Sequence, residues 1–186
     1  MNEQTVRKTF KYKLRPTSAQ AQALGTVLRR CREVYNAGLE ERREAWRKCG
    51  VTVREYDQSA QLPAIKEARP EYQEVHSQVL QDVLHRLELA MQAFFRRIRE
   101  GQTPGYPRFQ GANRYNSFTY KQFGNGATLD NGFLVLSKIG RIAVRWSRPL
   151  EGAPKTVTVS READGWYACF SCAGAAASGN GTGDRN

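Results

Sequence analysis

The pattern of apolar and polar residues begins as a strand and continues as a helix. In Val6–Leu14, apolar or aromatic residues alternate with basic ones, which is typical of a half-buried strand with a positive exposed face. Pro16 ends this segment, and Thr17 or Ser18 can cap a helix whose apolar residues recur at helical spacing up to about Lys48. The start of the chain therefore predicts one strand and one long helix.

Two further helices are expected before the barrel half of the chain. Residues Glu55 to Glu67 have a helical pattern that Pro63 is expected to interrupt, because proline lacks a backbone N–H donor. A broad apolar stripe from about Val75 to Glu100 predicts a third helix that ends at Gly101. Arginines in its last turns suit the negative end of the helix dipole, so a structural and a nucleic-acid-binding role for them both stay open.

Beyond Gly101 the pattern changes to short alternating segments separated by turns. Asn-Gly and Asp-Gly pairs at 125–126, 131–132 and 164–165 are typical of tight turns between antiparallel strands. The expected strands are Ser117–Phe123, Phe133–Leu136, Arg141–Trp146, Thr156–Val159 and Trp166–Cys172. The second half of the chain is therefore predicted to form a small antiparallel β-barrel.

The simplest architecture is an α+β fold in which the first strand joins this late sheet. It places residues 1–15 in a small antiparallel β-barrel, residues 16–104 in an inserted α-helical domain with a helix-turn-helix-like start, and residues 105–173 in the rest of the barrel. Residues 174–186 contain no large apolar side chain, so a disordered tail is expected there.

The charge of the chain indicates the class of its partner. Its 186 residues include 29 Lys+Arg and 18 Asp+Glu, which gives a formal net charge of +11. With 40% hydrophobic and 10% aromatic residues, the chain is expected to fold with a basic surface. No stretch approaches the roughly 20 apolar residues of a membrane span, and the N-terminus has no apolar signal core. We therefore predict a cytoplasmic location, no membrane partner and a polyanionic ligand, with nucleic acid first.

The residue types that carry catalysis in other proteins form no recognisable site. Metal-assisted nuclease chemistry needs clustered carboxylates, and the aspartates are scattered. They are Asp57, Asp82, Asp130, Asp164 and Asp184. Cys169 and Cys172 have zinc-ligand spacing, but strand alternation puts them on opposite faces and no second pair accompanies them. We predict no catalytic residue, no metal site and no cofactor in this chain.

Basic residues are interleaved with aromatic ones in the barrel half. Between Gly101 and Arg148 there are seven basic residues and one acidic residue. Cations neutralise phosphates and planar rings stack on bases, so this mixture is typical of nucleic-acid-binding surfaces. The alternative is that the aromatics are core and the cations a solvated face. We assign Phe118 and Phe123 to the core and favour nucleic-acid contact for Tyr106, Arg108, Arg114 and Tyr115.

Six segments of the chain carry a family resemblance. They are Phe10-Lys-Tyr-Lys-Leu-Arg-Pro-Thr17, Cys31-Arg-x-Val-Tyr-Asn36, Leu80 to Phe95, Gly105-Tyr-Pro-Arg-Phe109, Ser117-Phe-Thr-Tyr120 and Leu136-Ser-Lys-Ile-Gly140. In this order and spacing they resemble the N-terminal half of the TnpB/OrfB family, over about residues 5 to 173. Proteins of this family are transposon-encoded RNA-guided nucleases, often named transposases, and are related to compact type V CRISPR effectors.

The resemblance implies that the barrel is a wedge domain and the inserted helices a recognition domain, which together bind a guide RNA and double-stranded target DNA. In such proteins base pairing reads the target, and the protein reads a short flanking motif. By position, the residues implied at the flanking DNA are Tyr56, Ser59, Ser77, Gln78, Gln81, Lys121 and Gln122. Contacts with RNA or phosphate are expected for Lys11, Lys13, Arg15, Arg29, Arg32, Tyr106, Arg108, Arg114, Tyr115, Lys138 and Arg141.

The resemblance also implies which parts of the family this chain lacks. The family continues into a nuclease domain with catalytic carboxylates, Mg²⁺ and a zinc site. We expect this chain to bind nucleic acid without that domain and without enzyme activity. Two alternatives stay open: a stand-alone DNA-binding regulator, and a subunit that completes a nuclease supplied by a separate chain. The expected location is the bacterial or archaeal cytoplasm, in association with the nucleoid.

Overall fold

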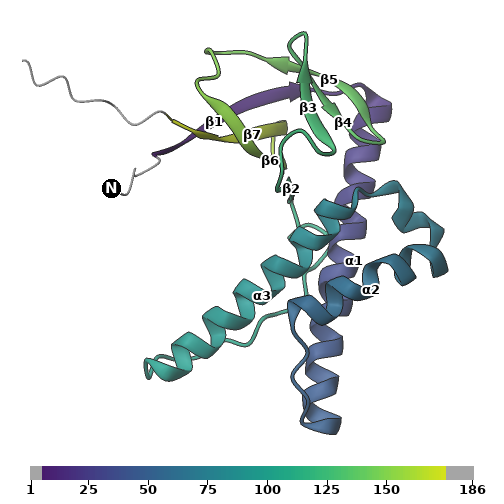
Figure 1. Cartoon of the computed structure of the whole chain (residues 1–186), viewed down its shortest axis with the longest axis vertical. Coiled ribbons are helices and arrows are strands. Elements are labelled where there is room, and N and C mark those ends of the chain that lie inside the picture. Colours follow the sequence, from purple (N-terminus) through teal and green to yellow (C-terminus); the bar gives the residue numbers. More distant parts are fainter. Residues whose placement is uncertain (1–5, 175–186) are drawn as a thin grey trace, which may run out of the picture.

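The computed structural model describes residues 6–174, which form a curled antiparallel sheet and three α-helices (Figure 1). The helical elements are α1 (Ser18–Cys49), α2 (Glu55–Ala68), the short 3-10 helix η1 (Pro70–Glu74) and α3 (Ser77–Arg99). The strands are β1 (Arg7–Arg15), β2 (Ser117–Tyr120), β3 (Ala127–Asp130), β4 (Phe133–Leu136), β5 (Gly140–Arg145), β6 (Ala153–Glu162) and β7 (Gly165–Ala173). Figure 1 shows the sheet at one end of the molecule, with α1 and α3 extending away from it.

The strand order confirms that the first strand joins the late sheet. The order is β2-β6-β7-β1-β5-β4-β3, so β1 lies between β7 and β5 and the helices are inserted between β1 and β2. All pairs are antiparallel. In the described part of the chain, the edge strands β2 and β3 do not pair with each other, so the sheet is a half-barrel and not a closed barrel. The α+β fold is confirmed; the expected tail beyond Gly174 lies outside the described residues.

In the sheet, the Asn-Gly and Asp-Gly pairs predicted the turns correctly, whereas the alternation of apolar residues missed one strand and misplaced the ends of others. Strand β3 was not predicted, because only one of its four residues, Ala127, is buried. It pairs with β4 across Asn131-Gly132, where φ is 46° and 79° and an Asn-Gly pair is favoured. Strand β2 ends at Tyr120, earlier than predicted, and β6 is longer than predicted at both ends.

The two first helices show one confirmed and one wrong prediction. Thr17 caps α1: its hydroxyl accepts from the Gln20 backbone N–H (3.2 Å), and the Gln20 side chain accepts from the Thr17 N–H (3.0 Å). Helix α2 continues through Pro63, whereas the sequence predicted an interruption. Leu62 is buried and Ile65 packs on the core, so tertiary contacts on either side of the proline offset the lost hydrogen bond.

One hydrophobic core joins the sheet to the helices. Tyr12, Phe118 and Phe170 contribute from the sheet, and Leu24 and Leu80 from the helices. As predicted, Phe118 is core, and Phe123 is partly buried against it. Among the described residues, no helix is long and apolar enough to span a membrane.

Arg86 on α3 fixes the helical part to the sheet. Its guanidinium donates to the Ser117 carbonyl (2.8 Å) and to Thr119 Oγ1 (2.8 Å) on β2. Its Nε donates to Asp82 Oδ2 one turn earlier (2.8 Å), so a half-buried cation has a carboxylate partner. This contact sets the position of α3 relative to β2, which determines the geometry of the interface described next.

Candidate nucleic-acid interface

Five of the residues predicted at flanking DNA lie on α3 and just after β2. Gln78 Nε2 donates to Gln122 Oε1 (3.2 Å), and the Gln122 backbone N–H donates to Gln78 Oε1 (3.2 Å). Lys121 Nζ lies 3.8 Å from Asp82 Oδ1 on α3. Ser77 and Gln81 are exposed on α3, one residue before and three residues after Gln78. The structure thus brings α3 and the end of β2 together into one polar surface, the α3–β2 junction.

The α3–β2 junction is bordered by cations. Lys66 Nζ donates to Ser77 Oγ (2.8 Å) and to the Val75 carbonyl (2.9 Å), and the Lys138 ammonium donates to the Gln73 carbonyl. Burial and the charges of Lys66 and Lys138 lower the pKa of His76, whose Nδ1 accepts from the Gln78 backbone N–H (3.2 Å). Burial, with the Lys138 charge, also lowers the pKa of Lys66. The local potential is therefore positive, and His76 is held in its neutral form near pH 7.

Tyr56 and Ser59, the two residues of α2 predicted to contact the flanking DNA, lie at different distances along α2 from the α3–β2 junction. Helices α2 and α3 run in opposite directions, because Glu55 contacts His85 (3.0 Å) while Lys66 contacts Ser77. Tyr56 is therefore roughly 15 Å along α2 from Lys66 at 1.5 Å per residue. Its side chain is 84% exposed, and Ser59 is half-buried between these two levels.

The predicted lysines of the sheet are paired with acids. Lys11 pairs with Glu162, and Lys13 Nζ lies 3.2 Å from Asp164 Oδ2. Arg141 pairs with Asp130 in the same way, and its guanidinium lies 4.8 Å from the Phe133 ring centre. Glu162 and Asp130 each lie two strands away from their partners in the sheet, and Asp164 lies in the turn between β6 and β7. The positive face that the sequence predicted for the first strand is therefore largely neutralised by cross-strand pairs.

Five of the arginines predicted to contact RNA or phosphate, unlike the residues just described, have no acidic partner in the part of the chain that the structure covers. Arg15, Arg29, Arg108 and Arg114 are exposed and Arg32 is half-buried. Within residues 6–174, none of these five guanidinium groups lies within ion-pair distance of a carboxylate. They are the predicted phosphate contacts whose charge stays available to a ligand.

Two hydrogen bonds join the loop before β2 to α1. Asn36 Nδ2 donates to the Gln110 carbonyl (3.0 Å), and the Gln110 N–H donates to Asn36 Oδ1 (2.7 Å). Tyr115 is buried beside Tyr35, with ring centres 6.0 Å apart, and burial raises its pKa. The Tyr115 ring therefore packs between the loop and α1, and its predicted contact with nucleic acid stays a prediction. Tyr106 stays partly exposed, with its ring at 5.2 Å from that of Phe94.

The cysteine pair lies as the sequence predicted. Cys172 is buried and Cys169 is half-buried on the other face of β7. Burial raises the pKa of both thiols. In the described part of the chain, no group of three or more His, Cys, Asp or Glu side chains is placed to hold a metal ion.

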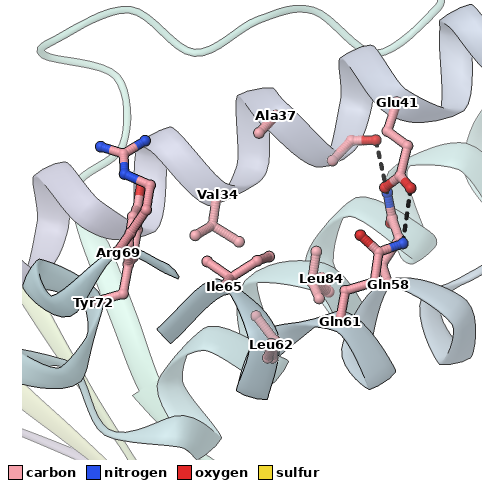
Figure 2. A pocket seen from close by; sticks show the side chains of 11 residues that line it. Val34, Ala37, Glu41, Gln58, Gln61, Leu62, Ile65, Arg69, Tyr72 and Leu84 are labelled. Atoms are coloured by element: carbon pink, nitrogen blue, oxygen red, sulfur yellow. Dashed lines mark hydrogen bonds between the residues drawn. The ribbon is translucent and has the colours of Figure 1, made fainter. Parts of the chain in front are cut away.

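A cavity of about 340 Å³ between α1 and α2 is a feature that the sequence did not predict (Figure 2). Its apolar wall includes Val34, Leu62 and Ile65. At one end Glu41 accepts from Gln58 Nε2 and from Gln61 Nε2, both at 2.8 Å, and Figure 2 shows these three side chains close together. These polar groups bond to one another, so the cavity belongs to the packing of α2 on α1 and not to the nucleic-acid interface.

Gln58 makes two further hydrogen bonds at the buried end of the contact between α1 and α2. Its Nε2 also donates to the Gly38 carbonyl (2.9 Å), and its Oε1 accepts from Arg42 Nε (2.9 Å). Arg42 in turn donates to Glu88 Oε2 on α3 (2.7 Å). A buried amide and a buried ion pair therefore connect all three helices, which holds the surface residues in fixed relative positions.

The fold is of the α+β class, and its first segment matches a family of DNA-binding domains. A family model described as a helix-turn-helix domain, HTH_OrfB_IS605, matches residues 1–50. In the described part of that match, β1 is followed by the single uninterrupted helix α1, and the next helix begins at Glu55.

Two curated relatives and one solved structure extend the comparison. The chain is 38% identical over 176 residues to a Streptomyces pristinaespiralis protein provisionally named RNA-guided DNA endonuclease. It is 32% identical over 169 residues to InsQ of Escherichia coli (strain K12), which has the same provisional name. The structure is similar to Cas12f1 in its complex with sgRNA and target DNA, with a TM-score of 0.50 and 12% identity over 92% of this chain.

These comparisons show that the chain is similar to the N-terminal region of TnpB-like proteins. The alignments include 91% and 85% of this chain, but only 42% and 38% of the two relatives and 49% of the Cas12f1 chain. The chain thus spans less than half the length of the proteins that it matches. Their complete activity does not follow from the similarity.

Proposed function

We propose that this chain binds a guide RNA scaffold and the duplex that flanks a DNA target, as the binding part of an RNA-guided DNA endonuclease. The observation that supports this most directly is the α3–β2 junction, where Gln78 and Gln122 bond to each other across 44 residues of sequence. Glutamine amides pair with adenine edges, and lysine pairs with guanine edges, in the major groove. The similarity to relatives named RNA-guided DNA endonucleases supports the same function.

The two kinds of residue have separate tasks in this proposal. Arg15, Arg29, Arg32, Arg108 and Arg114 contact phosphates, which supplies affinity without sequence preference. Gln122, whose side chain Gln78 orients, and Lys121 contact base edges, which supplies preference for a short motif. Arg86 and Asp82 act through these groups as positioning residues, because they hold α3 on β2.

The described aspartates do not converge on one site that could hold catalytic metal ions. The four described aspartates all have structural partners: Asp82 pairs with Arg86, Asp130 with Arg141, Asp164 with Lys13, and Asp57 caps α2 by accepting from the Arg54 N–H (2.9 Å). A two-metal nuclease needs carboxylates that converge on the ions. We therefore propose that the 186-residue chain binds nucleic acid and does not cut it.

Binding and cleavage are tested with the purified chain. A labelled structured RNA should bind with an affinity that falls steeply as salt rises, since phosphate contacts release counterions. Incubation with RNA, a matching DNA duplex and Mg²⁺ should leave the DNA intact. Metal-dependent cleavage by the pure chain would contradict the binding-only assignment.

Motif reading is tested by selection from a duplex library with a randomised flank, with and without the RNA that copurifies with the protein. We expect a short motif to be enriched only with RNA, and the Gln122→Ala variant to lose that enrichment. Gln102→Ala, which replaces an exposed glutamine three residues beyond the end of α3, is the matched control. Enrichment by RNA-free protein would favour the stand-alone DNA-binding regulator instead.

A further inference from the structure

Three arginines from two distant segments surround one open pocket beside α1. The pocket has a volume of about 520 Å³ and is lined by Arg29 and Arg32 of α1 and Arg161 of β6, together with Gln22, Gly25 and Thr26. Tyr115 and Ala112 line it from the loop before β2. We call it the arginine pocket. None of its lining residues is acidic.

The nearest acids are bonded to groups outside the pocket, although the charge of Arg29 also helps to lower the pKa of Glu33. Glu33, next to Arg32 on α1, accepts from Arg30 Nη1 (3.1 Å) and from the Tyr72 hydroxyl (2.9 Å). Glu162, next to Arg161, projects to the other face of β6 and pairs with Lys11. Two like charges one helical turn apart, joined by a third from a strand, repel one another unless an anion lies among them.

The motif around Arg32 places that side chain in the pocket. In Cys31-Arg-x-Val-Tyr-Asn36, the side chains of Cys31, Val34 and Tyr35 are buried, and Asn36 binds the loop at Gln110. Arg32 is the member of this motif that lines the pocket. Sequence reasoning selected Arg29 and Arg32 but missed Arg161, which stands alone in a strand and has no basic neighbour in the sequence.

Gly25 leaves room for a ligand. A Cβ added at this position would meet no atom within 4 Å, although glycine is unfavourable in the middle of a 32-residue helix. The absent side chain therefore keeps the pocket open on the α1 side. Thr26 and Gln22 add a hydroxyl and an amide that can donate to an oxygen anion.

From these observations we infer that the arginine pocket binds a phosphodiester group of a nucleic-acid strand, with Arg29, Arg32 and Arg161 as its ligands. Guanidinium groups bind phosphate oxygens in a bidentate manner, and their fixed charge suits an anion of constant charge. The inference rests on the proposed nucleic-acid binding. It adds the specific place on this fold where one strand is held between the helical part and the sheet.

The first test measures binding of a labelled RNA hairpin and of a DNA duplex of the same sequence to the full chain, over a salt series. Arg32→Gln and Arg161→Gln should each weaken binding about fivefold, and the slope of log affinity against log salt should fall by about 0.7 to 0.9, which corresponds to one phosphate contact. Arg43→Gln is the control, an exposed arginine on α1 outside the pocket. The probe that shows the larger loss identifies the source of the phosphate.

A second variant tests the pocket without changing its charge. Gly25→Met fills the open space and should make α1 more stable, because methionine has the higher helix propensity. We expect it to melt at a higher temperature and still to bind about fivefold more weakly. Arginine-specific modification by phenylglyoxal, read by mass spectrometry on the unmodified chain, should show that nucleic acid protects Arg29, Arg32 and Arg161 but leaves Arg43 reactive.

The outcomes separate the two proposals. If the unmodified chain binds neither probe, the proposed function fails and the pocket inference fails with it. If it binds but Arg32→Gln, Arg161→Gln and Gly25→Met all keep the original affinity and salt slope, only the pocket inference is overturned. Equal losses in Arg43→Gln and Arg32→Gln would also overturn it, since general charge and not this pocket would then explain the binding.

Discussion

The sheet and the first helix both carry many cations, but they use them in opposite ways. On the sheet, Lys8, Lys11 and Lys13 of β1 each pair with an acid, respectively Glu151, Glu162 and Asp164. Around α1, the three residues of the arginine pocket have no carboxylate among their lining neighbours. The attraction of a segment for a polyanion therefore depends less on its number of basic residues than on whether those residues already pair with acidic side chains.

Helix α1 also contains one cation, Arg42, that is paired with an acid and almost completely buried. The Arg42 side chain is 5% exposed and donates to Gln58 and to Glu88, so its charge is used inside the fold. Paired cations should thus affect the stability of the protein and unpaired ones its affinity for nucleic acid. Each prediction below tests one side of this division.

The largest effect is expected from Arg42→Ala. Removing one partner of a buried ion pair leaves the other charge without compensation, so the free energy of unfolding should fall by about 3 kcal/mol. Urea denaturation measures the change, and Arg43→Ala on the exposed side of α1 should stay within about 0.5 kcal/mol. An equal loss in both variants would show that the buried pair has no special weight.

The same pair predicts an acid limit to stability. Burial would raise the pKa of Glu88, but hydrogen bonds from Arg42 and Gln92 outweigh it and hold that pKa below its usual value. A lowered pKa in the folded state means that the contribution is present above the ordinary glutamate pKa and is lost as the pH falls through the folded-state pKa. Unfolding followed between pH 7 and pH 3 should therefore show a smaller decline for Glu88→Gln than for the unmodified chain.

The next largest effect concerns the unpaired class. In the triple variant Arg29→Gln, Arg32→Gln and Arg161→Gln, affinity for structured RNA should fall about 100-fold, since three losses of about fivefold each multiply when they are independent. The free energy of unfolding should change little, because these side chains make no ion pair among residues 6–174. Fluorescence anisotropy at fixed salt measures the affinity. A large loss of stability would show that these arginines stabilise the fold, as the paired cations do, and would contradict the prediction.

A smaller effect in the opposite direction should follow from freeing the sheet lysines. Replacing Glu162 by Gln and Asp164 by Asn removes the acidic partners of Lys11 and Lys13, and it changes Asp-Gly at 164–165 to Asn-Gly, which suits the same kind of turn. RNA affinity should rise about threefold, with a steeper dependence on salt. Unchanged affinity would mean that this face of the sheet lies away from the ligand.

The smallest effect is expected from removing the lysines themselves. With Lys8, Lys11 and Lys13 all replaced by Gln, RNA affinity should change by less than about twofold, because exposed ion pairs already neutralise them. The same anisotropy assay applies. A loss as large as that of the arginine triple variant would abolish the distinction between the two regions.

Sequence patterns predicted the elements whose burial repeats regularly and missed those that depend on distant partners. The alternation in β1 and the stripe of α1 are local signals, and both elements are present. Strand β3 has too few buried residues to show a pattern, and the continuity of α2 through Pro63 depends on the packing of Leu62 and Ile65.

The candidate site divides in the same manner. Arg29 and Arg32 could be selected as basic residues of the predicted first helix, and the family resemblance assigned both Gln78 and Gln122 to the flanking DNA. Tyr115 was assigned to the surface because its neighbours in the loop are polar, yet Tyr35 draws it into the core. Arg161 lacked a local signal, because only the pairing of β6 with β2 brings it beside α1.

The central position of β1 has a consequence for the order of assembly during synthesis. Its partners are β5, which ends at Arg145, and β7, whose Ala173 pairs with Arg7. Strand β1 is therefore synthesised well before both of its partners and must wait for them, while α1, α2 and α3 can pack locally. Non-local pairing of this kind slows folding. We expect the helical part to form first and the sheet last, so that until then the nascent chain exposes β1 to chaperones.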